Sequence, residues 1–147
     1  MASLNDIVNG LAATIEGNIP GLTAYSYMLP GGFSLPCVML EPIPGDYTQA
    51  FAAGDDKWTI LVYALVSAGG DQSAAQSELN TLITGWGPSS IRQVIYDNKN
   101  LGLADGTVAM ATGAHSFTGK IEIGTVETVC AVVNVLVHTD PKQYVTE

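Results

Sequence analysis

The sequence predicts an α+β fold, a mixed, mainly antiparallel sheet with an N-terminal helix and a central helical pair packed on one face. Lys57–Ser67 contains β-branched, aromatic and aliphatic residues without Gly or Pro, which is typical of a strand. Thr107–Thr139 is almost wholly β in pattern, whereas apolar residues near the N-terminus recur at helical spacing. A chain of 147 residues is expected to form a single domain, 1–147.

The chain carries few charges, and most of them are negative. Charged residues make up 13% of the sequence and hydrophobic residues 47%, and five basic residues against fourteen acidic ones give a net charge of −9. A soluble domain typically has about 25% charged residues. The shortage of polar surface favours an oligomer or part of an assembly over the alternative, a compact acidic monomer. The negative charge argues against the wrapping of DNA, which needs clustered Lys and Arg.

The lack of recognisable targeting signals leads us to expect a protein of the cytoplasm. No apolar run reaches the ~18 residues that a membrane helix needs. The N-terminus lacks the basic and apolar regions of a secretion signal. Cys37 and Cys130 lie on separate predicted strands, so we expect two buried thiols instead of a disulfide.

Four elements are predicted before the central strand, Lys57–Ser67. The first is a helix that begins at Ser3 and stops at Gly17-Asn18, and its apolar stripe consists of Leu4, Ile7, Val8, Leu11, Ala12 and Ile15. Leu22–Leu29 and Pro36–Glu41 follow as short strands. Alternating aromatic and small residues then predict a β-hairpin arm over Tyr47–Trp58 that projects from the sheet.

The hairpin arm is the candidate contact between subunits. Its aromatic side chains would be poorly buried in a monomer, and aspartates lie near its ends. The interface candidates are therefore Tyr47, Phe51, Trp58, Asp46 and Asp55. Lys57–Ser67 is apolar nearly throughout, so we expect burial on both of its faces. Helices would cover one face, and a neighbouring subunit would cover the other around Trp58.

Two helices and a long strand are predicted after the central strand. Gln72–Thr84 and Pro88–Asn98 have apolar stripes, and Trp86 between them is expected to plug the space between the helices. Val126–His138 is rich in valine and is the expected sheet neighbour of the central strand. Three glycines predict turns within Met110–Gly124, where the strand boundaries stay open.

The sequence contains no pattern that supports catalysis, a cofactor or a metal. His115 and His138 lie in different β segments, and no Gly-x-Ser-x-Gly elbow accompanies them. Asp55-Asp56 beside a glycine is typical of a turn more than of a cation site. The glycine pairs lack the spacing of phosphate-binding loops. We therefore predict no enzyme activity, no cofactor and no bound metal.

Several segments, taken in order, carry a resemblance to a known family. They are Met1–Ile7, Glu41-Pro42, Tyr47, Phe51, Gly54–Thr59, Asp71–Gln76, Leu79, Trp86–Ile91 and the closing valine-rich strand. In this order they resemble the tail terminator proteins of long-tailed (siphovirus-type) bacteriophages, particularly those of actinobacterial hosts. The resemblance spans most of the chain, and Ala111–Gly124 departs from it.

The resemblance implies an α+β sandwich that assembles as a homohexameric ring on the head-proximal end of the tail tube. The ring would stop tube polymerisation and provide the joint to the head, with the major tail tube protein and a head–tail connector or neck protein as partners. Phage DNA would pass through an acidic channel without specific binding. The expected location is the virion, after assembly in the host cytoplasm. The alternatives are another head–tail joining, neck or tail tube protein, and a small enzyme or ligand-binding α+β domain.

Overall fold

The computed structural model of the chain describes residues 4–28, 34–43, 57–67, 72–103, 108–116, 121–123 and 126–138. Within these ranges it confirms the predicted α+β class. The helices are α1 (Leu4–Asn18), α3 (Gln72–Ile83) and α4 (Ile91–Asp97). The strands are β1 (Thr23–Tyr25), β2 (Cys37–Ile43), β3 (Lys57–Ser67), β4 (Val108–Ser116), β5 (Ile121–Ile123) and β6 (Val126–His138). Both β3 and β6 have the predicted bounds.

The strands form one sheet with β3 and β6 near its middle. The strand order is β1-β2-β3-β6-β4, and β5 pairs with β6 off this path. Only the β1–β2 pair is parallel among the described strands, and the other pairs are antiparallel. β3 pairs with β6 over its whole length, from Lys57 opposite His138 to Ser67 opposite Thr128. The prediction that these two strands are neighbours in the sheet is confirmed.

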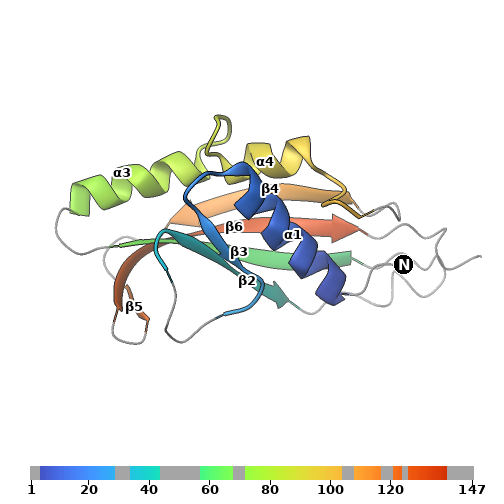
Figure 1. The fold of residues 1–147 in the computed structure, drawn as a ribbon, viewed down its shortest axis with the longest axis horizontal. Coiled ribbons are helices and arrows are strands. Elements are labelled where there is room, and N and C mark those ends of the chain that lie inside the picture. The colour runs from blue at the N-terminus through green and yellow to red at the C-terminus, as the bar shows by residue number, and fades with distance from the viewer. Residues whose placement is uncertain are drawn as a thin grey trace, which may run out of the picture.

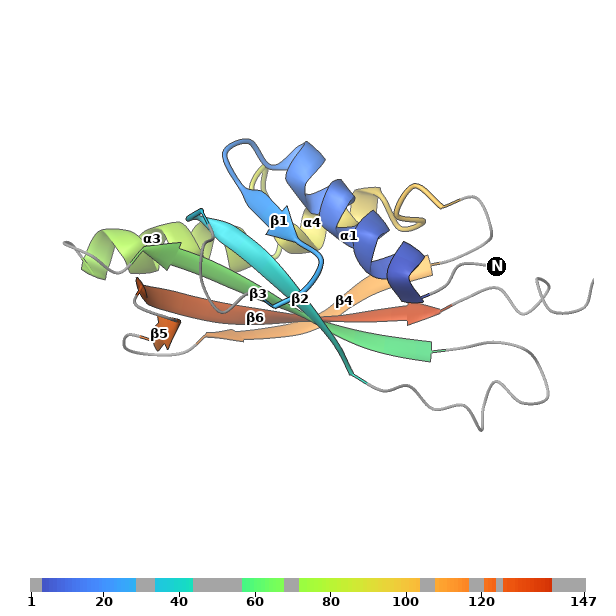
Figure 2. The same cartoon turned by 60° about the horizontal axis from the view of Figure 1, so that its bottom comes forward.

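The described helices lie on one face of the sheet, as Figure 1 and Figure 2 show. Successive side chains of a strand point to opposite faces, so alternate residues of β3 and β6 face the helices. These residues form the main core and are at most 3% exposed: Ile60, Val62, Ala64, Val66, Val129, Ala131, Val133, Val135 and Val137. Complete burial of a Val or Ile side chain is worth about 1.5–3 kcal/mol, so this face dominates the stability of the fold.

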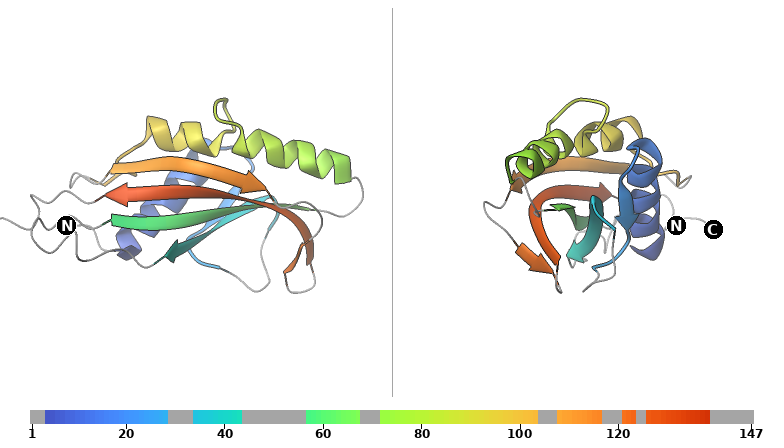
Figure 3. Two further views of the ribbon diagram at one scale, coloured as in Figure 1. Left: turned by 180° about the vertical axis from the view of Figure 1, so that it is seen from behind. Right: turned by 60° about the vertical axis from the view of Figure 1, so that its left-hand side comes forward.

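The other face of the sheet is covered at one end only. Cys37, Met39, Leu65 and Cys130 form a second buried cluster there, against which Tyr25, Leu35 and Tyr63 pack. Figure 3 shows β6 curving at this end, where it carries β5. Toward the start of β3 the same face is more open, because Thr59 and Leu61 are half-buried. The prediction that β3 is buried on both faces is therefore confirmed within the subunit at Leu65. At its first half one face is open, and the cover that a neighbouring subunit would provide there stays a prediction.

Two helices begin or end at residues other than those predicted. Helix α1 ends at Asn18, as predicted, and the Asn18 side-chain amide donates to the Thr14 carbonyl at 2.7 Å. Helix α3 ends at Ile83, one residue before the predicted Thr84. Helix α4 begins at Ile91, not at Pro88. The backbone of Ser90 is extended, and its hydroxyl accepts a hydrogen bond from the Gln93 amide at 3.2 Å. Ser90 is thus the N-cap that fixes where this helix starts.

The first two strands also differ from their predicted bounds. β1 is shorter than Leu22–Leu29, and β2 runs through Pro42 to Ile43 instead of ending at Glu41. A proline lacks the amide that a strand needs on a paired edge. Pro42 stands opposite Ile60 of β3, and because β1 pairs only with Cys37–Met39, the outer edge of β2 has no described partner at Pro42.

The two cysteines are free and buried, as expected. Burial raises the pKa of the Cys37 thiol to about 11. Burial, followed by the influence of Cys37, raises the pKa of the Cys130 thiol to about 12. The thiolate is the reactive form of cysteine, so these groups are inert at neutral pH. In the described ranges, no helix combines the length and apolar character that crossing a membrane requires.

We predict that the cysteines make the stability of the protein fall in alkaline solution. Their pKa values are raised above the ordinary value of 9.0, so as pH rises the unfolded chain releases these protons first. The stabilisation is complete below about pH 9 and is lost as pH rises toward the folded values. Urea unfolding near pH 8 and near pH 10 measures this loss. A Cys37→Ala, Cys130→Ala variant should lose less stability over the same interval, and an equal loss in both proteins would contradict the prediction.

Candidate assembly surface

An apolar area lies on the sheet face opposite the helices, at the end where β3 begins. Strand register places Ile43, Thr59, Leu136 and Met110 side by side across β2, β3, β6 and β4. Ile43 is 39% and Met110 52% exposed, and the two central residues are half-buried. Val108 lies two residues before Met110 on β4, opposite His138, and is 46% exposed. We call these five residues the open face.

A buried polar atom lies next to the open face. Asn134 of β6 is opposite Leu61 of β3, on the same side of the sheet. Its side-chain carbonyl oxygen Oδ1 is buried and has no hydrogen-bond partner among the described residues. A buried acceptor without a partner costs about 1–3 kcal/mol, and this oxygen is closed to solvent within the subunit. Asn134 is also the residue that interrupts the otherwise apolar pattern of this side of β6.

The same face carries one hydrogen-bonded polar pair toward its covered end. The Tyr63 hydroxyl donates to Glu41 Oε1 at 2.9 Å. Partial burial, and then the hydrogen bond to the Glu41 carboxylate, raise the pKa of Tyr63. The phenol therefore stays protonated and continues to donate at neutral pH. This pair marks the boundary between the covered end of the face and the open face.

Of the predicted interface residues, Trp58 is the one that the structure places. Tyr47, Phe51, Asp46 and Asp55 lie outside the described residues, as does most of the predicted arm. Trp58 is opposite Val137 in the β3–β6 ladder, and its half-buried side chain packs against the main core. The subunit's own core therefore holds Trp58, and a part for it in subunit contact stays a prediction.

Trp86 does not plug the space between the helices, and that prediction was wrong. The side chain lies in the connection between α3 and α4 and is 54% exposed. The Arg92 guanidinium carbon lies 4.8 Å from the centroid of the Trp86 ring. The flanking Gly85 makes room, because a Cβ there would stand 3.1 Å from the Arg92 Nη1 atom. The core between the helices is filled instead by aliphatic side chains, including Leu79 and Ile91.

Trp86 belongs to a surface of alternating rings and cations. Its ring meets Tyr96 edge to face, with the centroids 5.4 Å apart and the planes at 79°. The Lys99 ammonium lies 4.4 Å from the centroid of the Tyr96 ring. Contacts of this kind are worth about 0.5–1 kcal/mol each at exposed sites. We call Trp86, Arg92, Tyr96 and Lys99 the aromatic–cation patch. Arg92 and Tyr96 are four residues apart, which places them on one side of α4, and Lys99 lies two residues beyond the end of the helix.

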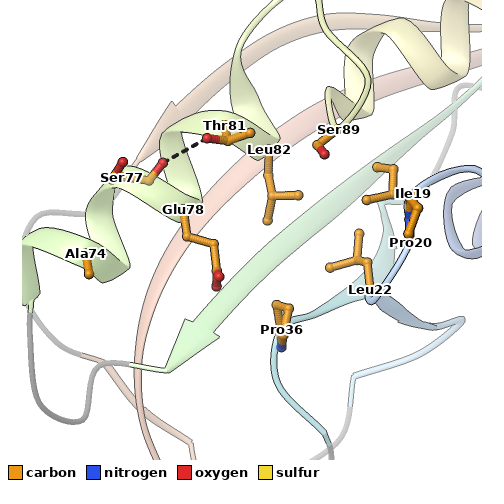
Figure 4. A pocket seen from close by; sticks show the side chains of 10 residues that line it. All are labelled: Ile19, Pro20, Leu22, Pro36, Ala74, Ser77, Glu78, Thr81, Leu82 and Ser89. Carbon is orange, nitrogen blue, oxygen red and sulfur yellow. Dashed lines mark hydrogen bonds between the residues drawn. The ribbon is translucent and has the colours of Figure 1, made fainter.

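A groove of about 460 Å³ lies between α3 and the turn that follows α1. Figure 4 shows the apolar side chains of Leu22, Leu82 and Pro36 facing one another across it, and Glu78 extending toward the opening from α3. Thr81 donates to the Ser77 carbonyl at 3.0 Å, so its hydroxyl is used within the helix. The lining contains one carboxylate and neither histidine nor cysteine. This set of groups provides no nucleophile–base pair.

Titratable groups do not gather elsewhere in the described structure either. No group of three or more His, Cys, Asp or Glu residues within the described ranges is arranged to hold a metal ion. His138 stands at the end of β6, in the same row of the sheet as Val108, and the two cysteines are buried. The prominent features of the described surface are therefore apolar and aromatic areas, which suit contact with another protein.

Comparison of the chain with models of protein families and with curated proteins found no match. The features that bear on function are therefore the open face, the aromatic–cation patch and the composition of the chain.

We predict different costs for removing the two tryptophans. Trp58→Ala should lower the free energy of unfolding by about 3 kcal/mol, because the side chain packs against the core. Trp86→Ala should lower it by about 1 kcal/mol or less, since the lost contacts are on the surface. Urea denaturation of the two variants, followed by far-UV circular dichroism, measures both values. Equal losses would contradict the assignment of one residue to the core and the other to the surface.

Proposed function

We propose that the protein is a structural subunit of a phage virion, a tail terminator that forms a homohexameric ring on the head-proximal end of the tail tube. The observation that carries the proposal is the open face. It presents Ile43, Val108 and Met110 to solvent on a sheet that helices cover only on the other side. An apolar sheet face of this kind is characteristic of a surface that another protein covers.

The composition of the chain also supports assembly. The chain has only 13% charged residues, which leaves little polar surface for a subunit that stays alone. This composition favours a subunit of an assembly over an isolated domain.

A terminator acts by covering the end of the tail tube. A ring of head-to-tail contacts closes on itself, so it has a fixed number of subunits. One side of the ring covers the last layer of the tail tube, and the other side offers no equivalent surface to a further tube subunit. It offers a joint to the head–tail connector or neck protein instead. Such a protein needs neither catalysis nor a cofactor.

The net charge of −9 suits the passage of DNA through the ring. Like charges repel, so an acidic channel would let the phosphate backbone slide without specific binding. The ring would form in the host cytoplasm and remain in the virion.

The open face also suits another head–tail joining or tail tube protein, because any of these would cover it with protein. The oligomer distinguishes the possibilities. A terminator forms closed rings of six subunits, a tube protein forms open stacks of increasing length, and a ligand-binding domain stays monomeric. Native mass spectrometry gives the number of subunits, and negative-stain microscopy shows whether the ring is closed.

We predict that charges placed on the open face prevent assembly without unfolding the subunit. An Ile43→Lys, Met110→Lys variant should be monomeric at concentrations where the wild type forms rings, because each lysine would have to lose its water on contact. Both side chains are already exposed, so the circular dichroism spectrum and melting temperature should change little.

The matched control is a Tyr27→Lys, Met28→Lys variant. It places two lysines on exposed positions after β1 that do not belong to the open face, and it should still form rings. A wild-type protein that stays monomeric would overturn the proposed function. Rings formed by the Ile43→Lys, Met110→Lys variant would show that assembly does not use the open face.

A further inference from the structure

The aromatic–cation patch carries positive charge in a strongly acidic chain. Arg92 and Lys99 are the only Lys or Arg residues whose side chains lie in the described part of the structure, and within that part neither is paired with a carboxylate. Each lies over an exposed aromatic ring instead. Trp, Tyr and Arg are enriched among the residues that dominate the binding energy of protein interfaces. The patch therefore has the composition of a binding surface for an apolar partner with a negative charge.

Trp86 is the part of the patch that can enter a hollow in another surface. It lies in the connection between α3 and α4, which Figure 1 shows rising above both helices, and its side chain is 54% exposed. The Arg92 guanidinium carbon lies 4.8 Å from the centroid of its ring. A tryptophan side chain buries about 150–250 Å² when it is covered. An indole with a guanidinium beside it fits a hollow that has apolar walls and a carboxylate near its opening.

The groove between α3 and the turn after α1 has these properties, and we call it the α3 groove. The side chains of Leu22, Pro36 and Leu82 form apolar walls around a volume of about 460 Å³ (Figure 4). Pockets of about 300–1,000 Å³ hold small organic molecules, so an indole ring has room here. Glu78 extends from α3 toward the opening, is exposed, and has no cationic partner within the described residues. The α3 groove thus offers what Trp86 and Arg92 together require.

The two surfaces lie toward opposite edges of the sheet. The patch is beside β4, at one end of the strand order, whereas Leu22 and Pro36 of the α3 groove come just before β1 and β2 at the other end. The connection between α3 and α4 separates them, because Ser89 lines the α3 groove while Trp86 contacts Arg92. Trp86 and the groove are therefore presented on different sides of one subunit, as a contact repeated from copy to copy requires.

Charge excludes contact between the patches of two copies and favours contact between a patch and an α3 groove. In a two-fold dimer the same surfaces meet, so Arg92 and Lys99 would face identical cations. The carboxylate of Glu78 provides the opposite charge at the groove. Contact between two different surfaces is heterologous, which is the kind that generates rings.

We infer that Trp86 of each subunit inserts into the α3 groove of the neighbouring copy, where Arg92 pairs with Glu78. This inference rests on the proposed ring and names a contact that closes it. The partner is a second copy of this chain, bound through a surface different from its own patch. Val108 and Met110 of the open face line a groove together with Arg92, so the neighbour that holds Trp86 also lies beside the open face.

Charge exchange between the two surfaces tests the inference. Arg92→Glu changes the net charge from −9 by −2 to −11, and Glu78→Arg changes it from −9 by +2 to −7. Each substitution alone sets like charges against each other at every contact. By native mass spectrometry, each variant should need at least about tenfold more protein than the wild type for half of its subunits to assemble.

The double variant Glu78→Arg, Arg92→Glu should recover the oligomer. Every contact then joins opposite charges again, with the two signs exchanged between patch and groove. Its net charge is −9, as in the wild type, because the changes of +2 and −2 cancel. The recovery therefore reports the contact and not the total charge, and salt should weaken the rings because the contact is charged.

A second pair of variants tests insertion without changing any charge. Ser77 is exposed and lines the α3 groove, so the larger side chain of Ser77→Phe should occupy the groove and keep Trp86 out. This variant should be monomeric. The matched control is Asn80→Phe, which places the same ring at an exposed position of α3 outside the groove lining and should still form rings. Circular dichroism of every variant verifies that the subunit is folded.

The outcomes distinguish the inference from the proposed function. A monomeric wild type would overturn the proposed ring and the inference with it. A wild-type ring together with a Ser77→Phe variant that still assembles would overturn the inference alone. So would a folded double variant that stays monomeric, because Arg92 and Glu78 would then not be partners.

Discussion

The pairing of β3 with β6 is the interaction on which the rest of the structure depends. It aligns the small, branched side chains of both strands into one continuous surface, and the helices pack on that surface. The result is asymmetric, because helices cover one face of the sheet and the other face is covered only around Leu65, Met39 and the two cysteines. The covered side accounts for the stability of the subunit, and the open side leaves apolar surface for a second protein.

The two candidate contact areas are connected by the position of β4 at the edge of the sheet. Met110 faces the open side, while Ala109 and Ala111 face the main core beneath the helices. α4 lies beside the same strand and carries Arg92, and Lys99 lies two residues beyond the end of this helix. An edge strand that helps to form two surfaces places them next to each other, so a partner that covers one is well positioned to contact the other.

Charge and apolar area have separate parts in this surface. In the proposed assembly, the apolar open face would supply the burial that stabilises association, and it would give little orientation because the hydrophobic effect is not directional. The cations over Trp86 and Tyr96 would favour a partner surface of complementary charge.

The sequence by itself determined the α+β class, both long strands, their pairing and the buried free cysteines, because periodicity and residue type depend on local geometry. It did not determine where α4 starts or that β2 passes through Pro42, since these depend on the cap at Ser90 and on how far β1 extends. Only the tertiary structure decided that Trp58 packs against the core and that Trp86 lies on the surface. A tryptophan suits either place, and the choice follows from which side of the sheet or helix its backbone presents. The exposure of one face in the first half of β3 likewise depends on where the other elements pack, which no local sequence pattern encodes.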